Sequence, residues 1–224
     1  MPEAPVGKPL GLFGGTFDPL HYGHLRLAEE AADALDLARV RWIPAGQPAL
    51  RAAPQASAAQ RLEMVRLAIA DNPRFEVDAA EVESARPSYT VATLERLRQA
   101  SACGAQRPLV LLLGADAFSG LAEWHRWEAL FDLAHIAVAH RPGFPLAPAN
   151  LPDALARCYR DRFCEHPATL SAAPAGRIAT FAMTPLDISA TKIRALLSKH
   201  CSPRYLLPDA LLAYIKDHQL YPET

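Results

Sequence analysis

Short apolar runs alternate with helix-like patterns along most of this chain, and this alternation restricts its fold more than any other feature. The predicted strands cover residues 10–13, 40–43, 74–77, 109–113, 135–139 and 177–181. The predicted helices cover residues 25–37, 58–70, 90–100, 127–132, 191–197 and 209–216. Strands that alternate with helices pair in parallel, because each helix returns the chain to the same edge of the sheet. The sequence therefore predicts an α/β fold: a Rossmann-like, doubly wound, mostly parallel sheet with helices on both faces.

The length and charge of the chain favour a conventional enzyme. Its 224 residues, 50% of them hydrophobic, can bury a substantial core. We expect one domain over residues 1–224, with the C-terminal helical part (about 188–224) packed on the sheet. The 23 basic and 24 acidic residues give a formal net charge of −1, so we expect neither nucleic acid nor a membrane as a partner. Whether the chain forms a homo-oligomer stays open.

Targeting signals and cysteine patterns are weak. Residues 1–8 show no signal-peptide pattern and no apolar run reaches membrane-spanning length, so a cytoplasmic protein is expected. The cysteines show no C-x-x-C pair and are expected to be free thiols: Cys103, Cys158, Cys164 and Cys201. None of them has the usual zinc spacing, and no metal held by the protein itself is expected.

The first predicted strand leads into residues 14–24, which read G-G-T-F-D-P-L-H-Y-G-H. Paired glycines after a buried strand indicate a turn that needs positive φ or close backbone approach, and Asp18-Pro19 continues that turn. A helix is predicted to begin near Gly23 or His24. Its free N–H groups and positive dipole end favour a bound phosphate. The alternative is a tight turn in which the two histidines are only solvated or capping.

A second polar segment, residues 188–194, reads I-S-A-T-K-I-R. Ser189 is a predicted helix N-cap. Lys192 and Arg194 put cations in the first turns of this helix, where each opposes the dipole by about 0.3–1 kcal/mol unless an anion is bound. The alternative is that both side chains simply reach solvent. Together, the two segments could bind one polyphosphate through helix N-termini, histidines, hydroxyls and cations. The sequence has neither a P-loop nor a G-x-G-x-x-G fingerprint, which argues against a P-loop NTPase or an ordinary dehydrogenase.

These segments resemble a known signature. Residues 14–24 are similar to the G-G-T-F-D-P-x-H-x-G-H motif of the nucleotidyltransferase superfamily that shares H-x-G-H, and residues 188–194 resemble its I-S-x-T-x-x-R partner. Within this superfamily, the chain most resembles the bacterial nicotinate-nucleotide adenylyltransferases. Further matching segments follow in family order, so that the resemblance covers nearly the whole chain: P-S-Y-T at 87–90, G-A-D-A at 114–117, the segment around Trp124, and R-P-G at 141–143.

The resemblance implies an enzyme of NAD biosynthesis that binds ATP. Such an enzyme transfers the adenylyl group of ATP to nicotinate mononucleotide, giving nicotinate adenine dinucleotide and pyrophosphate. The nucleophile is the phosphate of the substrate, so no covalent enzyme intermediate is implied. Catalysis then depends on positioning and charge stabilisation, with Mg²⁺ carried by ATP.

The resemblance also implies roles for residues at matching positions. It implies a catalytic role for His21, His24 and Arg194. Contacts with ATP and its phosphates are implied for Gly14, Gly15, Thr16, Phe17, Asp116, Arg141, Ser189 and Thr191. The nicotinate side is implied at Ser88, Thr90 and Trp124, where an aromatic face can stack on the ring. Two alternatives stay open: Trp124 can be a packing residue, and Asp116 can cap the helix that follows it.

One loop departs from the family pattern. Many relatives carry P-P-H-K or P-P-H-R after the second strand, whereas this chain has Pro48-Ala49-Leu50-Arg51. Leu50 cannot donate a hydrogen bond, so the usual contribution of this loop to substrate binding is in doubt, although Arg51 keeps a cation.

Three other functions were weighed against this one. The first is a sister adenylyltransferase that acts on nicotinamide mononucleotide or phosphopantetheine. The second is a nucleotide sensor that binds without catalysis. The third is a hydrolase whose metal is held by His21, His24 and Asp18, but this spacing lacks the H-E-x-x-H helix geometry.

Overall fold

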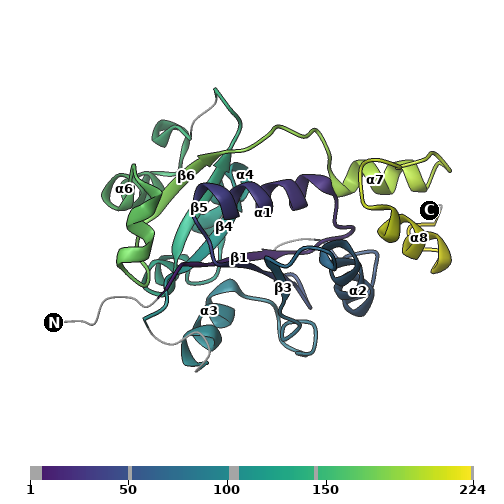
Figure 1. Ribbon diagram of the computed structural model, residues 1–224, viewed down its shortest axis with the longest axis horizontal. Coiled ribbons are helices and arrows are strands. Elements are labelled where there is room, and N and C mark those ends of the chain that lie inside the picture. The colour runs from purple at the N-terminus through teal and green to yellow at the C-terminus, as the bar shows by residue number, and fades with distance from the viewer. Residues whose placement is uncertain (1–6, 50–51, 101–105, 144–145, 223–224) are drawn as a thin grey trace. The chain divides into compact units, whose positions relative to one another are not determined.

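The computed structural model describes residues 7–49, 52–100, 106–143 and 146–222. Its sheet has six strands in the order β3-β2-β1-β4-β5-β6. The strands are β1 (Leu10–Gly15), β2 (Arg39–Pro44), β3 (Phe75–Val77), β4 (Leu109–Gly114), β5 (His135–His140) and β6 (Ile178–Ala182). The pairs β1–β4, β4–β5 and β5–β6 are parallel. Figure 1 shows α1 (Tyr22–Ala34) on one face of β1 and α3 (Thr90–Gln99) on the other, which confirms the predicted doubly wound α/β fold.

The other helices are α2 (Ala58–Ile69), α4 (Ala115–Ser119), α5 (Leu130–Leu133), α6 (Asp153–Arg162), α7 (Ala190–Leu197) and α8 (Asp209–Asp217). Single 3₁₀ turns cover Leu121–Glu123, Trp127–Ala129, Pro148–Asn150 and Pro167–Ala172. Every predicted strand is found, with ends displaced by at most two residues. Within the described ranges, no helix is long and apolar enough to cross a membrane.

The first helix begins one or two residues before the predicted start at Gly23 or His24. It begins at Tyr22 and ends at Ala34, whereas the apolar pattern continued to Leu37. The helix ends because Asp36 adopts a left-handed φ of 47° and the Leu37 N–H donates to the carbonyl of Ala32, as in a Schellman C-cap. Leu37 is buried beyond this cap, which explains why the periodicity extended past the helix.

The chain forms two compact units, which are described separately. Unit 1 comprises the described residues of Met1–Phe13, Leu27–Arg41 and Tyr89–Thr184, and unit 2 those of Gly14–Arg26, Trp42–Ser88 and Pro185–Thr224. Three elements, β1, α1 and β2, run through both units. The expectation of a single domain over residues 1–224 stays a prediction.

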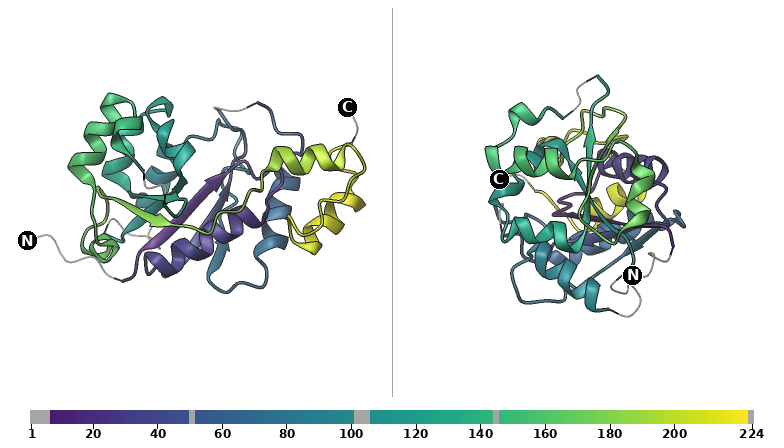
Figure 2. Two further views of the ribbon diagram at one scale, coloured as in Figure 1. Left: turned by 90° about the horizontal axis from the view of Figure 1, so that it is seen from above. Right: turned by 90° about the vertical axis from the view of Figure 1, so that its left-hand side faces the viewer.

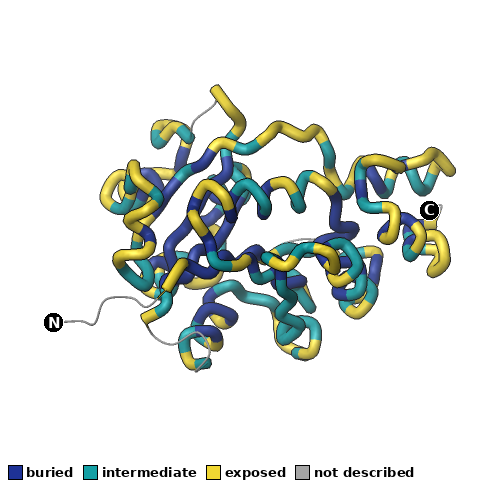
Figure 3. The backbone as a smooth tube through the Cα atoms, in the orientation of Figure 1, coloured by how far each residue is buried: buried dark blue, intermediate teal, exposed yellow. Residues whose placement is uncertain are grey.

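In unit 1, β4 and β5 lie in the core, and Figure 3 shows them mostly in the colour of buried residues. His135 at the start of β5 is fully buried and neutral. Its Nδ1 accepts from the N–H of Arg177 at 3.0 Å, and its Nε2 donates to the carbonyl of Ala173 at 2.8 Å. Burial lowers the pKa of this ring. The Arg98 guanidinium donates to the carbonyls that precede three strands, those of Arg107, Leu133 and Pro174.

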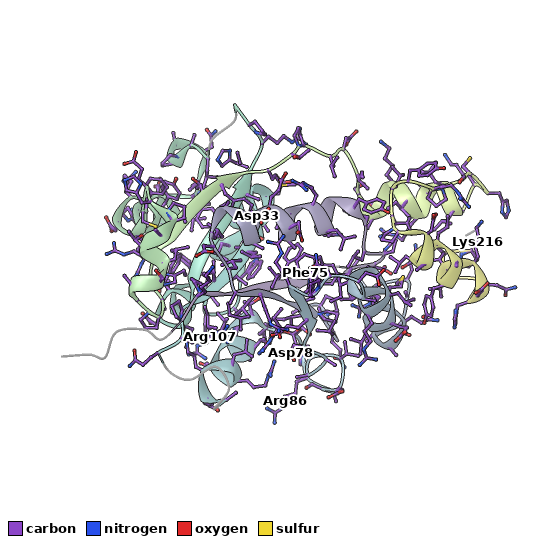
Figure 4. All side chains as sticks on the ribbon, in the orientation of Figure 1. Asp33, Phe75, Asp78, Arg86, Arg107 and Lys216 are labelled. Atoms are coloured by element: carbon purple, nitrogen blue, oxygen red, sulfur yellow. The ribbon has the colours of Figure 1, made fainter. Side chains whose placement is uncertain are left out.

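In unit 2, α8 packs against α2, as Figures 1 and 2 show. A capping box begins α2: the Ser57 hydroxyl accepts from the N–H of Gln60, whose side chain accepts from the N–H of Ser57. Figure 4 shows Phe75 inside this unit, whereas Arg86 and Lys216 lie on its surface.

The most buried charged side chain of unit 2 is Arg61 on α2, which is only 1% exposed. Its guanidinium donates to the carbonyls of Thr16 (2.8 Å) and Ala45 (2.6 Å), directly after β1 and β2. It also donates to the carbonyls of Gly46 (3.1 Å) and Ala56 (3.2 Å). A buried cation is tolerated when its donors are satisfied in this way. Arg61 therefore fixes the loops at the carboxyl ends of the first two strands.

We expect Arg61→Met to lower the free energy of unfolding by about 3 kcal/mol, because it leaves buried carbonyls without their donor. Urea denaturation monitored by circular dichroism measures this change. Arg66→Met is the matched control on the same helix, where the exposed Arg66 contacts Glu63 at 3.6 Å. It should change the unfolding free energy by less than about 0.5 kcal/mol. Equal losses in both variants would contradict the role given to Arg61.

Candidate active site

The turn after β1 is shaped by a close approach between Gly15 and the ring of Phe17. A Cβ on Gly15 would lie 2.7 Å from that ring, whereas a Cβ on Gly14 would have no atom nearer than 3.9 Å. The expected close approach is therefore confirmed at Gly15. The positive φ belongs to Phe17, at 51°, and not to either glycine. The Phe17 ring then meets the edge of the His24 ring, with centroids 5.2 Å apart.

The two motif histidines stack at the start of α1. Because α1 begins at Tyr22, His21 immediately precedes the helix and His24 lies in its first turn. Their ring centroids are 3.7 Å apart, and His21 is 6% exposed, so His21 is not a solvated side chain. The Nδ1 of His24 accepts from the N–H of His21 at 3.3 Å, so the capping alternative is met in part. In the neutral ring of His24, the hydrogen is then on Nε2.

His21 is a buried histidine with an unused nitrogen. Burial lowers its pKa from 6.5 to about 4, so the ring is neutral at physiological pH. Among the described residues, its buried Nδ1 has no hydrogen-bond partner. A Cβ on Gly23 would lie 3.0 Å from this atom, which explains why a glycine separates the two histidines. A buried nitrogen of this kind needs a partner, and a bound anion or water can supply it.

The second motif begins α7, and Ser189 is its N-cap as predicted: the hydroxyl accepts from the N–H of Lys192 at 3.2 Å. The two cations of this helix differ. Lys192 is exposed and lies 3.5 Å from Asp187. Arg194 is half-buried and donates to the main-chain carbonyl of Asp18 at 2.6 Å and to the Thr191 hydroxyl at 3.3 Å. The alternative that both reach solvent holds for Lys192 and is wrong for Arg194.

The bond from Arg194 to Asp18 joins the two motifs inside unit 2, although they are 176 positions apart in sequence. Asp18 is only 6% exposed, and its carboxylate accepts three hydrogen bonds. The donors are the N–H groups of Gln55 (2.8 Å) and Ala56 (3.1 Å) and the hydroxyl of Tyr221 (2.8 Å). The sequence indicated Asp18 as a turn residue and as a possible metal ligand, but not as a buried hydrogen-bond acceptor. It gave no signal for Arg61 or Tyr221, because their burial depends on distant partners.

The residues implied for the nicotinate side lie partly in unit 1. Thr90 begins α3, Trp124 follows the 3₁₀ turn Leu121–Glu123, and both are half-buried. Their neighbours in sequence, Tyr89 and His125, are in ring contact with centroids 4.6 Å apart. An ion pair between Arg126 and Glu95 at 2.9 Å makes a second contact between these segments. Thr90 and Trp124 therefore belong to one local region.

Two further implied residues of unit 1 are exposed: Asp116 on α4 and Arg141 in the turn after β5. Asp116 does not cap α4, because Gly114 occupies the N-cap position and no side chain forms a capping hydrogen bond at this helix end. The capping alternative is therefore wrong. Ser88, which belongs to unit 2, accepts from the N–H of Gln47 through its hydroxyl at 3.2 Å and donates its own N–H to the Gln47 carbonyl at 2.9 Å. It thus fixes the loop after β2.

Some predictions concern residues whose structure is not described. Leu50 and Arg51 of the unusual loop and Cys103 lie outside the described residues. The other cysteines, Cys158, Cys164 and Cys201, are free thiols as expected. In the part of the chain that the structure describes, no group of three or more His, Cys, Asp or Glu side chains is placed to hold a metal ion.

Comparison with known proteins gives the class first. Residues 12–196 match the cytidylyltransferase-like family, so the protein is a nucleotidyltransferase of that family. A relative from Dechloromonas aromatica is 61% identical over 96% of this chain and 99% of its own length, and bears the name nicotinate-nucleotide adenylyltransferase. Another with this name, from Acidithiobacillus ferrooxidans, is 48% identical over 95% of each chain. The chain belongs to the nicotinate-nucleotide adenylyltransferase family, as the motifs indicated.

Solved structures confirm the fold at much lower sequence identity. The nicotinic acid mononucleotide adenylyltransferase of Plasmodium falciparum, complexed with NaAD, matches with a TM-score of 0.70 at 15% identity. The match covers 96% of this chain and 98% of the parasite chain. The same protein complexed with APC matches with a TM-score of 0.69.

The low pKa of His21 makes the stability of the protein depend on pH. The unfolded chain binds a proton at this ring near pH 6.5, whereas the folded chain binds it only near pH 4. The stability from neutral His21 is therefore present above pH 6.5 and is lost as the pH falls towards 4. Between pH 7 and pH 5 we expect His21 to account for about 2 kcal/mol of lost unfolding free energy.

Urea denaturation of the wild type and His21→Gln at both pH values measures this share. The variant should lose less stability than the wild type on acidification. His218→Gln, at an exposed site on the turn after α8, is the control and should behave as the wild type. Parallel curves for the wild type and His21→Gln would contradict the assignment of a neutral, buried His21.

Proposed function

We propose that the protein transfers the adenylyl group of ATP to the phosphate of nicotinate mononucleotide, forming nicotinate adenine dinucleotide and pyrophosphate. The observation that carries this proposal is the hydrogen bond from Arg194 to the Asp18 carbonyl, which joins both parts of the family signature in one unit. The names of the curated relatives at 61% and 48% identity support the reaction and the acceptor.

In the proposed reaction, an oxygen of the mononucleotide phosphate attacks the α-phosphorus of ATP. One phosphorus–oxygen bond forms, the bond between the α-phosphorus and the bridging oxygen breaks, and pyrophosphate leaves. The protein donates no atom to the product, so its contribution is orientation and charge stabilisation. Well-aligned reactants can gain about 7–11 kcal/mol from orientation alone.

The phosphate-binding residues proposed in unit 2 offer donors of several kinds. His21 and His24 contribute N–H groups, Ser189 and Thr191 contribute hydroxyls, and Arg194 contributes a cation. Gly14, Gly15, Thr16 and Phe17 add main-chain contacts on the turn before α1. The N-termini of α1 and α7 favour an anion on both segments. Because His21 is neutral, it can donate a hydrogen bond to a phosphate oxygen without carrying a full charge.

Mg²⁺ is proposed as an ion that ATP carries into the site. The side chains fit this role better than that of a metal cage. The Asp18 carboxylate already accepts three hydrogen bonds, and the described residues provide no acidic or histidine cluster. Phosphate oxygens and water would therefore supply most of the ligands of the ion. The hydroxyls of Ser189 and Thr191 would bind the same phosphates. The ion supplies positive charge that lowers the repulsion between the two anionic substrates.

For the nicotinate side, the proposal keeps the residues that the family resemblance implies, Ser88, Thr90 and Trp124. The half-buried Trp124 ring offers a face for stacking, and the Ser88 hydroxyl can still donate while it accepts from Gln47. Asp116 and Arg141 are exposed side chains that are free to meet ribose or phosphate groups. The proposed partners are ATP and nicotinate mononucleotide, without nucleic acid or membrane.

Pyrophosphate release with ATP and either nicotinate or nicotinamide mononucleotide tests the reaction. We expect turnover that depends on both substrates and on Mg²⁺ and that is faster with nicotinate mononucleotide. Faster turnover with the nicotinamide substrate would overturn the proposed acceptor. ATP binding without any pyrophosphate release would identify a nucleotide sensor instead.

We expect His24→Ala to lower the turnover number by about 100-fold or more, because it removes a preorganised donor next to the reacting phosphates. Its melting temperature should stay close to that of the wild type, since His24 is only half-buried. His218→Ala removes an exposed histidine of the same unit and should keep normal turnover. Near-normal turnover of a folded His24→Ala protein would remove His24 from the catalytic residues.

A further inference from the structure

The last turn of the described chain places a tyrosine hydroxyl against the first motif. Tyr221 is 3% exposed and donates to the Oδ1 of Asp18 at 2.8 Å, across 203 positions of sequence. The ring lies in the same unit as both phosphate-binding motifs. No sequence motif marked this residue, and the reaction proposed above gives it no part.

The end of α8 directs Tyr221 inwards. Gln219 adopts a left-handed φ of 49°, and the N–H of Leu220 donates to the carbonyl of Ile215 at 3.0 Å, as in a Schellman C-cap. Since α8 packs against α2, the tail is held where its hydroxyl also lies 4.0 Å from the Met64 sulfur. The C-cap of α8 and its packing against α2 therefore fix the position of Tyr221.

Asp18, which Tyr221 contacts, accepts hydrogen bonds from several segments of unit 2. The Asp18 carboxylate accepts from the Tyr221 hydroxyl and two main-chain N–H groups, while its main-chain carbonyl accepts from Arg194 at 2.6 Å. Asp18 also precedes His21 by only three residues. A change in the orientation of Asp18 therefore alters the position of Arg194 and of the turn that carries the histidines.

The tyrosine is a permanent donor in this arrangement. Burial raises the pKa of its hydroxyl, and the neighbouring Asp18 carboxylate raises it further. The hydroxyl stays protonated throughout the physiological range and can therefore donate to Asp18. Loss of the hydroxyl would leave a buried carboxylate oxygen with one donor fewer.

We propose that Tyr221 is a positioning residue for the phosphate-binding side of the active site, acting through Asp18 on Arg194. This inference rests on the proposed function. Tyr221 touches neither substrate, and its role is to hold the Arg194 guanidinium in the geometry that ATP requires. The C-terminal tail is in this way a part of the active-site architecture.

The test compares Tyr221→Phe, which removes only the hydroxyl, with Tyr159→Phe. Tyr159 is a buried tyrosine of unit 1 whose ring packs against Phe118 and Phe163, so its variant controls for loss of a buried hydroxyl. Steady-state kinetics with each substrate varied are measured well below the melting temperatures of all variants. We expect Tyr221→Phe to lower kcat/KM for ATP by about tenfold and to keep KM for the mononucleotide within about twofold. Tyr159→Phe should match the wild type.

A second comparison tests the route through Arg194. In an Arg194→Lys background, the guanidinium that Tyr221 positions is already absent, so adding Tyr221→Phe should lower kcat/KM for ATP by less than about twofold. A purely structural role would instead reduce all kinetic parameters together, or would lower only the melting temperature.

The outcomes separate the two proposals. An inactive wild type would overturn the proposed function. An active wild type with unchanged ATP kinetics in Tyr221→Phe would overturn this inference alone. The same conclusion would follow if Tyr221→Phe had equal effects in the wild-type and Arg194→Lys backgrounds.

Discussion

The arrangement of unit 2 depends on the hydrogen bonds that the buried Asp18 carboxylate accepts. A carboxylate loses much of its solvation when it is only 6% exposed, so it must be matched by strong donors. Here the donors come from the loop before α2 and from the C-terminal tail, while Arg194 of α7 binds the carbonyl of the same residue. Segments at residues 18, 55, 194 and 221 are thereby fixed around one residue, Asp18. Leaving this charge without one of its partners is costly, which makes the arrangement specific.

Two arginines, the buried Arg61 and the half-buried Arg98, satisfy main-chain carbonyls at strand ends, each within its own unit. Arg61 donates to the carbonyls that follow β1 and β2. Ligands of doubly wound sheets bind at these strand ends. Arg98 collects carbonyls that precede β4, β5 and β6. Main-chain carbonyls in loops lack the regular partners of a sheet, and a guanidinium with five N–H groups can satisfy several at once. Rigid loops at the carboxyl ends of β1 and β2 then give the proposed phosphate-binding residues fixed positions.

The sequence predicts the sheet well and the site only in part, for physical reasons. Buried parallel strands are continuous apolar runs, so β4 and β5 could be located without their partners. The helix α6 was missed, because its charged residues leave a narrow apolar stripe of Leu155, Ala156 and Tyr159. The motif segments could be recognised because each is a continuous run of sequence, residues 14–24 and 188–194. The partners of Asp18 could not, because they lie 37 to 203 positions away and only the fold brings them together.

The neutrality of His21 bears on how the proposed site can favour the transition state over the bound substrate. Fixed cations attract ATP and pyrophosphate alike, so a site made only of cations would bind the substrate and the product tightly without a proportionate gain in rate. A buried, neutral imidazole contributes little to the binding of the whole polyphosphate but can donate to one oxygen whose charge increases during the transfer. The stacking of His24 on His21 keeps both rings oriented, and the desolvated position strengthens any hydrogen bond they make. Burial of His21 therefore lowers the stability of the protein in acid, while the same burial supplies the directed donor that the proposed reaction needs.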